Sequence, residues 1–307
     1  TTFAAGSNYS YKDEYRIFSQ FGRLNYDFDE RYLLNFVVRR DGISSLASDN
    51  RFGIFPGMSA GWNLHKEEFF KNSSLSDYVS SVKPRFSYGV NGNVAGIGNY
   101  EVQGVYGSQG NYNTNLGFLS TSIINTGLRW EKSTTMDVGV DVGLLKNRIS
   151  LMVDYYDRRT SDLLTNLTLP SYTGYSSVRT NLGTFQNTGL ELTLNATILQ
   201  KPNGLVWNVG GNVSFVANKI LQLPYNGNEN NRQGGLQVYD PAQGKVVWVG
   251  GLQEGRPLGA IYGYKQVSIF KNDEEVARIA GNRVDNVAGI GGPSTTMTNK
   301  IAPGDVN

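Results

Sequence analysis

The chain has 307 residues, of which 28 are basic and 26 are acidic, so its formal net charge is +2. It contains no Cys and one His, which excludes a disulfide scaffold, a cysteine zinc site, a thiol nucleophile and any two-histidine metal site. The balanced charge excludes a basic nucleic-acid footprint, and a chain with 12% aromatic residues and 37 glycines does not have the composition of a disordered protein.

Apolar and polar residues alternate along most of the chain. Val138 and Val140, for example, alternate with Asp137, Gly139 and Asp141, a pattern typical of a strand with one apolar face. The predicted strands run about 10–14 residues, which exceeds the common length of about 5–6 and is enough to cross a bilayer. In chain order they are predicted over residues 15–27, 31–41, 51–64, 82–91, 134–144, 148–158, 184–198 and 205–218, with a weaker ninth over 256–270.

The two faces of these strands differ in polarity. The apolar face, predicted to contact lipid, includes Leu34, Phe36, Val138, Val140, Leu151, Val153, Leu192 and Val209. The polar face, predicted to line a wet lumen or to contact a plug, carries Arg39, Asp41, Arg85, Asp137, Asp141, Asp154 and Glu191. Since a soluble β-sandwich also tolerates such residues on its outer face, face polarity alone does not decide between the two folds. On this assignment we expect Gly139→Ser, on the polar face, to be nearly silent.

Short and long connections alternate. Short ones are predicted over 28–30, 145–147 and 199–204, and long ones over 42–50, 92–133, 159–183 and 219–255. Outer-membrane barrels have short periplasmic turns, long extracellular loops and aromatic residues at both interfaces, and Tyr26, Phe28, Tyr32, Trp62 and Trp207 lie beside predicted turns. The pattern therefore predicts an all-β fold, an antiparallel transmembrane β-barrel segment of about nine strands.

Two segments depart from this alternation. The connection over 64–81 is longer than a periplasmic turn, and residues 66–71 within it are compatible with one helical turn. Residues 271–307 break the strand pattern, with a short helix predicted over 273–280.

No catalytic residue, metal site or cofactor is predicted, so we do not expect an enzyme. The run Gly57-Met58-Ser59-Ala60-Gly61 fits G-x-S-x-G, but that motif requires a sharp strand-to-helix turn, whereas the strand alternation continues through it. His65 has no predicted metal-binding partner and is interpreted as a turn residue.

The long loops contain the candidate ligand-binding residues. Aromatic rings beside Asn and Gln amides suit sugars or peptides, because rings stack on apolar faces while amides form hydrogen bonds. The alternative is that these rings only pack the loops together. The candidates are Tyr106, Tyr112, Tyr172, Tyr175, Tyr239 and Trp248.

An ordered series of short segments resembles the SusC/RagA type of TonB-dependent outer-membrane transporters. The segments, at 21–26, 29–34, 51–57, 85–93, 128–132, 137–141 and 154–157, succeed one another within 15–270. The resemblance implies uptake of glycans or oligopeptides across the outer membrane of a Gram-negative bacterium. It also implies a SusD-like surface lipoprotein as partner, outer-membrane lipid around the barrel, and TonB acting through an N-terminal region.

The chain has fewer predicted strands than the family pattern. Large transporters of this kind have about 22 strands around a plugged lumen, against about nine here. Residues 1–270 are therefore interpreted as part of the barrel, 271–307 as a loop and short helix leading to further strands, and no plug domain is expected within the chain. The alternatives are a soluble, secreted glycan-binding β-sandwich and a small passive porin.

Overall fold

The computed structural model describes residues 12–113, 115–202, 204–240, 243–260 and 271. The chain divides into two compact units, 1–224 and 225–307, each of which is described by itself.

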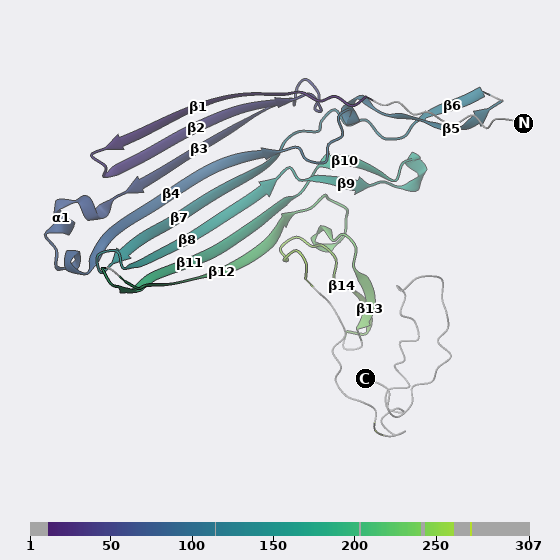
Figure 1. The fold of residues 1–307 in the computed structure, drawn as a ribbon. Coiled ribbons are helices and arrows are strands. Elements are labelled where there is room, and N and C mark those ends of the chain that lie inside the picture. Colours follow the sequence, from purple (N-terminus) through teal and green to yellow (C-terminus); the bar gives the residue numbers. More distant parts are fainter. Residues whose placement is uncertain (1–11, 114, 203, 241–242, 261–270, 272–307) are drawn as a thin grey trace, which may run out of the picture. The chain divides into compact units, whose positions relative to one another are not determined.

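The first unit is built on one eight-stranded antiparallel sheet (Figure 1). Each strand lies beside the previous long strand of the chain, so the sheet is an up-and-down meander in the order β1-β2-β3-β4-β7-β8-β11-β12. The strands are β1 (Ile17–Phe28), β2 (Tyr32–Ile43), β3 (Phe52–Trp62), β4 (Val79–Asn93), β7 (Glu131–Leu144), β8 (Ile149–Ser161), β11 (Thr184–Gln200) and β12 (Val206–Gln222).

These eight strands confirm the eight clear strands predicted from the alternation. They form one sheet rather than two sheets packed face to face, so the sandwich alternative is wrong. The weaker strand predicted over 256–270 is not formed at 256–260, and its remainder lies outside the described residues. The helix predicted over 273–280 also lies outside them.

The end of the sheet that carries the short connections is called the turn end. Asp29 and Glu30 have φ values of 55° and 50° in the β1–β2 turn. The longer β3–β4 connection contains the predicted helical turn as α1 (Glu68–Lys71), flanked by the 3-10 helices η1 (Leu64–Lys66) and η2 (Ser74–Asp77). Among the described residues, no helix has the length and apolar character needed to cross a membrane.

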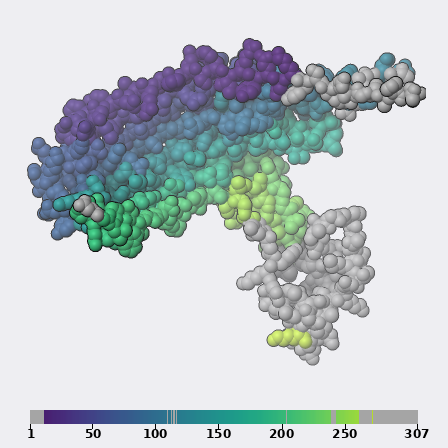
Figure 2. Space-filling view, viewed as in Figure 1, coloured from purple at the N-terminus to yellow at the C-terminus, as the bar shows by residue number. Residues whose placement is uncertain are grey.

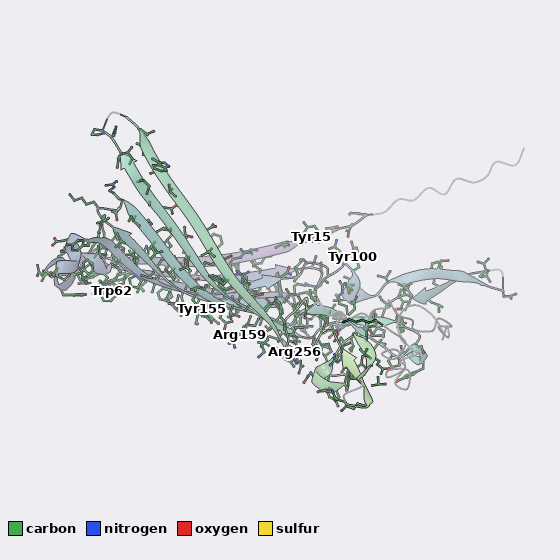
Figure 3. All side chains as sticks on the ribbon, turned by 90° about the horizontal axis from the view of Figure 1, so that it is seen from below. Tyr15, Trp62, Tyr100, Tyr155, Arg159 and Arg256 are labelled. Carbon is green, nitrogen blue, oxygen red and sulfur yellow. The ribbon has the colours of Figure 1, made fainter. Side chains whose placement is uncertain are left out.

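The opposite end, called the loop end, carries two short hairpins in the first unit. Trp62 lies at the turn end and Tyr100 at the loop end (Figure 3). The hairpins pair β5 (Tyr106–Tyr112) with β6 (Asn115–Ser120) and β9 (Leu164–Thr168) with β10 (Ser177–Asn181). Two more 3-10 helices, η3 (Glu101–Gln103) and η4 (Ser171–Thr173), belong to the same loops.

In the second unit, β13 (Leu236–Asp240) pairs with β14 (Lys245–Val249), and η5 (Glu229–Asn231) precedes them. All six short strands fall inside the long loops predicted over 92–133, 159–183 and 219–255. The sequence analysis missed them because they span only five to seven residues, which is too short for a clear alternation.

The strands of the first unit form one continuous wall (Figure 2), and its largest buried cluster lies at the loop end. The cluster comprises Ile43, Leu46, Phe55, Val102, Leu128 and Trp130. Most apolar side chains in the middle of the sheet are exposed or half-buried, so this sheet does not enclose a core of its own.

Candidate functional site: two faces of the sheet and its loop end

The strand register separates the side chains into an apolar face and a polar face. One row of the apolar face runs across seven strands through Leu34, Ala60, Phe86, Val138, Tyr155, Leu190 and Phe215. All eight residues predicted to contact lipid belong to this face. One row of the polar face runs through Gly61, Arg85, Gly139, Asp154 and Glu191.

The apolar residues form a band that crosses the strands obliquely. On β2 they run from Tyr32 to Val38, and the next residue on that face is Arg40. On β8 they run from Ile149 to Tyr155, and the next is Asp157. The band is therefore four alternating residues high on both strands.

The apolar band ends at different rows of the sheet on β2 and on β8, at its limit toward the loop end. Asp157 aligns through Met136, Tyr88 and Met58 with Phe36, and Arg40 lies four residues further along β2. The edge thus moves four residues over four strand-to-strand steps. With a rise of about 3.3 Å per residue and a strand spacing of about 4.8 Å, one residue per strand corresponds to a tilt of about 35°, which is the range of strand tilt in membrane barrels.

Arg85 organises an ion network on the polar face. Its Nε and Nη2 donate to Asp141 Oδ1 at 3.0 and 2.7 Å, and its Nη2 also donates to Asp154 Oδ1 at 2.8 Å. The side chains of Arg85, Asp141 and Asp154 are 31%, 35% and 23% exposed. These three residues lie on adjacent strands and are far apart in the sequence, so only the register brings them together.

Gly139 makes room for this network. A Cβ atom at Gly139 would lie 2.0 Å from Asp154 Oδ1 and 3.1 Å from Arg85 Nη2. Any side chain here must displace the Asp154 carboxylate from Arg85. The space above Gly139 is filled by the Asp154 carboxylate, so the structure favours a measurable cost for Gly139→Ser over the nearly silent behaviour expected from the sequence, and the variant stays a prediction.

The other predicted lumen residues lie on the same polar face. Arg39 Nη2 pairs with Asp41 Oδ2 at 2.8 Å, and Asp41 is buried. Asp137 lies in the row of Asn35, and Glu191 aligns with Asp154. The polar face thus presents both charges, with acids in excess between β4 and β11.

At the turn end, aromatic rings and the Glu67 carboxylate lie where the apolar band ends. The Tyr32 and Trp62 rings stack with centroids 6.3 Å apart, and the Phe69 ring centroid lies 6.4 Å from that of Trp62. Trp62 Nε1 donates to Glu67 Oε1 at 3.0 Å, and Arg31 Nη1 donates to Glu67 Oε2 at 3.2 Å. These hydrogen bonds, with one from Tyr32, lower the pKa of the Glu67 carboxyl, the bond from Trp62 most.

At the loop end, Phe55 is a buried aromatic residue on the polar face. Its ring is buried and meets the Trp130 ring edge-on at 5.3 Å, while Trp130 Nε1 donates to the Arg51 carbonyl at 3.0 Å. A Cβ at Gly92 would lie 2.1 Å from the Phe55 ring. The sequence analysis missed this cluster, although an aromatic residue among the polar positions of the predicted strand 51–64 is a signal for it.

A buried asparagine ties two loops together beside that cluster. Asn181 Oδ1 accepts from the Arg129 backbone N–H at 2.8 Å, and Asn181 Nδ2 donates to the carbonyls of Arg129 and Asp162, also at 2.8 Å. Arg129 Nη2 further pairs with Asp162 Oδ1 at 2.6 Å. The loop before β7 and the loop after β8 are therefore joined by hydrogen bonds and an ion pair.

The candidate ligand residues lie in three separate hairpins. Tyr106, on β5, is 69% exposed and Tyr172, in η4, is 88% exposed, whereas Tyr175 is half-buried. Trp248 lies on β14 and is half exposed, and the side chains of Tyr112 and Tyr239 lie outside what the structure describes. The exposed rings are available for a ligand, but the structure brings no two of the described ones into ring contact.

The remaining motifs have structural places. Gly57–Gly61 lies in the middle of β3 rather than at a strand-to-helix turn, and His65 Nδ1 lies 3.3 Å from the Val82 backbone nitrogen. Within the described part of the chain, no cluster of three His, Asp or Glu residues is arranged to hold a metal ion.

Comparison with known proteins agrees with this architecture. The family described as "TonB dependent receptor-like, beta-barrel" matches residues 1–283. The chain belongs to this family. TonB-dependent receptor P3 of Formosa agariphila is 34% identical over 282 residues, covering 89% of this chain and 27% of that protein. SusC of Bacteroides thetaiotaomicron is 33% identical over 221 residues, covering 70% of this chain and 22% of SusC.

A solved structure shows the same arrangement of strands. The RagAB peptide importer in its closed-closed state matches with a TM-score of 0.64 and 29% identity, covering 79% of this chain and 25% of that chain. Together these relatives identify a SusC-like β-barrel segment of a Gram-negative outer-membrane protein. The chain spans about a quarter of the length of the relatives that it matches.

Proposed function

We propose that this segment forms part of the barrel wall and extracellular loops of a TonB-dependent importer of glycans or oligopeptides. The oligopeptide class is supported by the match to the RagAB structure, which is described as a peptide importer, and the glycan class rests on the resemblance to SusC/RagA-type transporters. In this proposal residues 1–270 belong to the barrel, and residues 271–307 lead toward further strands.

The oblique apolar band is the observation that carries the membrane part of the proposal. Between β8 and β2 the loop-end edge of the band shifts by four residues over four strands, and such a shift is what tilted strands produce when their outer surface meets a hydrocarbon layer of fixed thickness. The apolar face, with Val140 and Leu192 at its centre, then contacts outer-membrane lipid, and the polar face lines the lumen.

The polar face provides the contacts for a plug or a passing solute. Asp137, Asp141, Asp154 and Glu191 outnumber the basic residues of the same rows, so this wall favours cationic or hydrogen-bonding groups opposite it. The proposed partners are TonB, acting through an N-terminal region, and a SusD-like lipoprotein at the loop end, with no nucleic acid.

The test is uptake by the full-length protein in cells lacking the chromosomal copy. Labelled oligosaccharides and oligopeptides are supplied to strains with and without functional TonB. An importer of this class loses uptake without TonB, whereas a passive porin retains it. Uptake that persists without TonB would contradict the proposal.

Loop-end substrate contact is tested with two exposed tyrosines. Tyr172→Ala removes an 88% exposed ring at the loop end, and Tyr78→Ala removes a 67% exposed ring at the turn end. We expect only Tyr172→Ala to raise the half-saturating substrate concentration, by about two- to tenfold if the ring stacks on substrate. Equal behaviour of the two variants would exclude a ligand role for Tyr172.

A further inference from the structure

The apolar face of the eight strands carries its charges at one end only. The structure describes every residue of these strands, and their charged residues on this face are Arg40, Lys132, Arg159, Lys219 and a single acid, Asp157. All five lie at the loop end, and together they carry an excess of three positive charges.

These cations lie just beyond the apolar band. Arg40 follows Val38 after one alternation, and Arg159 follows Tyr155 after two (Figure 3). Lys132 and Lys219 likewise lie four residues beyond Met136 and Phe215, respectively. Cations on distant strands thus lie two to four residues beyond the loop-end edge of the oblique band, where headgroups replace acyl chains in a bilayer.

Local contacts hold the two guanidinium groups at the surface. The Arg40 guanidinium lies over the Phe52 ring, 4.1 Å from its centroid. Arg159 Nη2 pairs with Asp157 Oδ2 at 3.0 Å, and Gln186 Nε2 donates to both Asp157 carboxylate oxygens at 3.0 Å. Arg159 remains 60% exposed although Asp157 is only 17% exposed, so the pair fixes Arg159 without covering it.

We propose that Arg40, Lys132, Arg159 and Lys219 form a basic border that binds phosphate groups of lipid headgroups in the leaflet at the loop end. The inference rests on the proposed contact between the apolar face and lipid. Above such a band the nearest anions are headgroup phosphates, and guanidinium groups bind phosphate with two parallel hydrogen bonds. On this face the eight strands have no charged residue at the turn end, where the cations Lys71, Lys146 and Arg148 belong to the connections between strands.

The experiment measures lipid binding to the full-length protein in neutral detergent by native mass spectrometry. Phosphatidylglycerol is the anionic probe and phosphatidylcholine of the same acyl chains is the zwitterionic reference. The test variant is Arg40→Gln/Arg159→Gln. The matched control is Arg158→Gln, because Arg158 is the neighbour of Arg159 on β8 but lies on the polar face, where its Nε donates to Thr135 Oγ1.

We expect the wild type to prefer phosphatidylglycerol, and each lost charge to lower that preference about fivefold, from about 1 kcal/mol per basic residue near an anionic surface. Arg158→Gln should keep the wild-type preference. An equal loss in the control, or no loss in the double variant, would overturn the basic border. If the double variant does not fold, Lys132→Gln/Lys219→Gln is measured in its place with the same expectation.

Failure of the underlying proposal gives a different result. A protein that binds neither lipid has no lipid-contacting face, which overturns the membrane assignment and the basic border together. A protein that binds phosphatidylcholine without preferring phosphatidylglycerol keeps the membrane assignment and loses only the border.

Discussion

The two faces of the same eight strands are stabilised in different ways. The apolar face consists of Val, Leu, Met and aromatic residues in a band that no other described part of the protein covers. The polar face is held by specific pairs, such as Arg85 with Asp141 and Asp154. Substitutions on the first face should therefore depend on polarity and depth, and those on the second on individual contacts.

The largest loss of stability is expected at Phe55, the buried aromatic residue on the polar face. Phe55→Ala should lower the free energy of unfolding by about 3–5 kcal/mol, because it leaves a cavity among buried residues. Phe36→Ala, on the apolar face, should cost less, because acyl chains can occupy the vacated space. Urea unfolding of the full-length protein in detergent micelles compares the two, and a larger loss for Phe36→Ala would contradict the face assignment.

The next effect separates adjacent residues on one strand. Leu192→Arg places a charge in the band and should cost about 2–4 kcal/mol at the midplane, as should Val140→Arg in the same row. Thr193→Arg, one residue along β11 on the polar face, should be tolerated. The measurement is the folded fraction recovered in lipid vesicles; similar losses at both β11 positions would mean that the apolar face does not meet lipid.

A smaller effect compares two glycines of the polar face. Gly139→Ala should destabilise by about 1–3 kcal/mol, because it separates Asp154 from Arg85 and leaves charged groups less well paired. A Cβ atom at Gly89 would meet no neighbouring atom within 4 Å, so Gly89→Ala should be neutral or slightly stabilising. Thermal unfolding of both variants tests whether the ion network restricts residue 139.

The smallest effect is a pH dependence at the turn end. The pKa of Glu67 is lowered in the folded protein, so its contribution is present above the ordinary pKa of about 4.3 and is lost as the pH falls through the folded value. Glu67→Gln should flatten the stability profile in that acidic range. An unchanged profile would show that the contacts from Trp62 and Arg31 do not favour the ionised carboxylate.

The sequence predicted the parts of the structure that depend on local periodicity. Alternation over ten or more residues located all eight long strands, and the same alternation assigned Val140 and Asp141 to opposite faces. The helical turn predicted over 66–71, within a connection too long for a periplasmic turn, forms at Glu68–Lys71. The short hairpins were missed because strands such as Leu164–Thr168 are too short for a periodic signal.

By itself, then, the sequence determined which side chains share a face, since the direction of a side chain in a strand alternates with residue number. The tertiary structure decided which of them meet. The pairing of Arg85 with Asp154, the crowding above Gly139, the Phe55–Trp130 contact and the oblique course of the band all depend on the register between strands. Register joins residues tens of positions apart, and no local pattern encodes that distance.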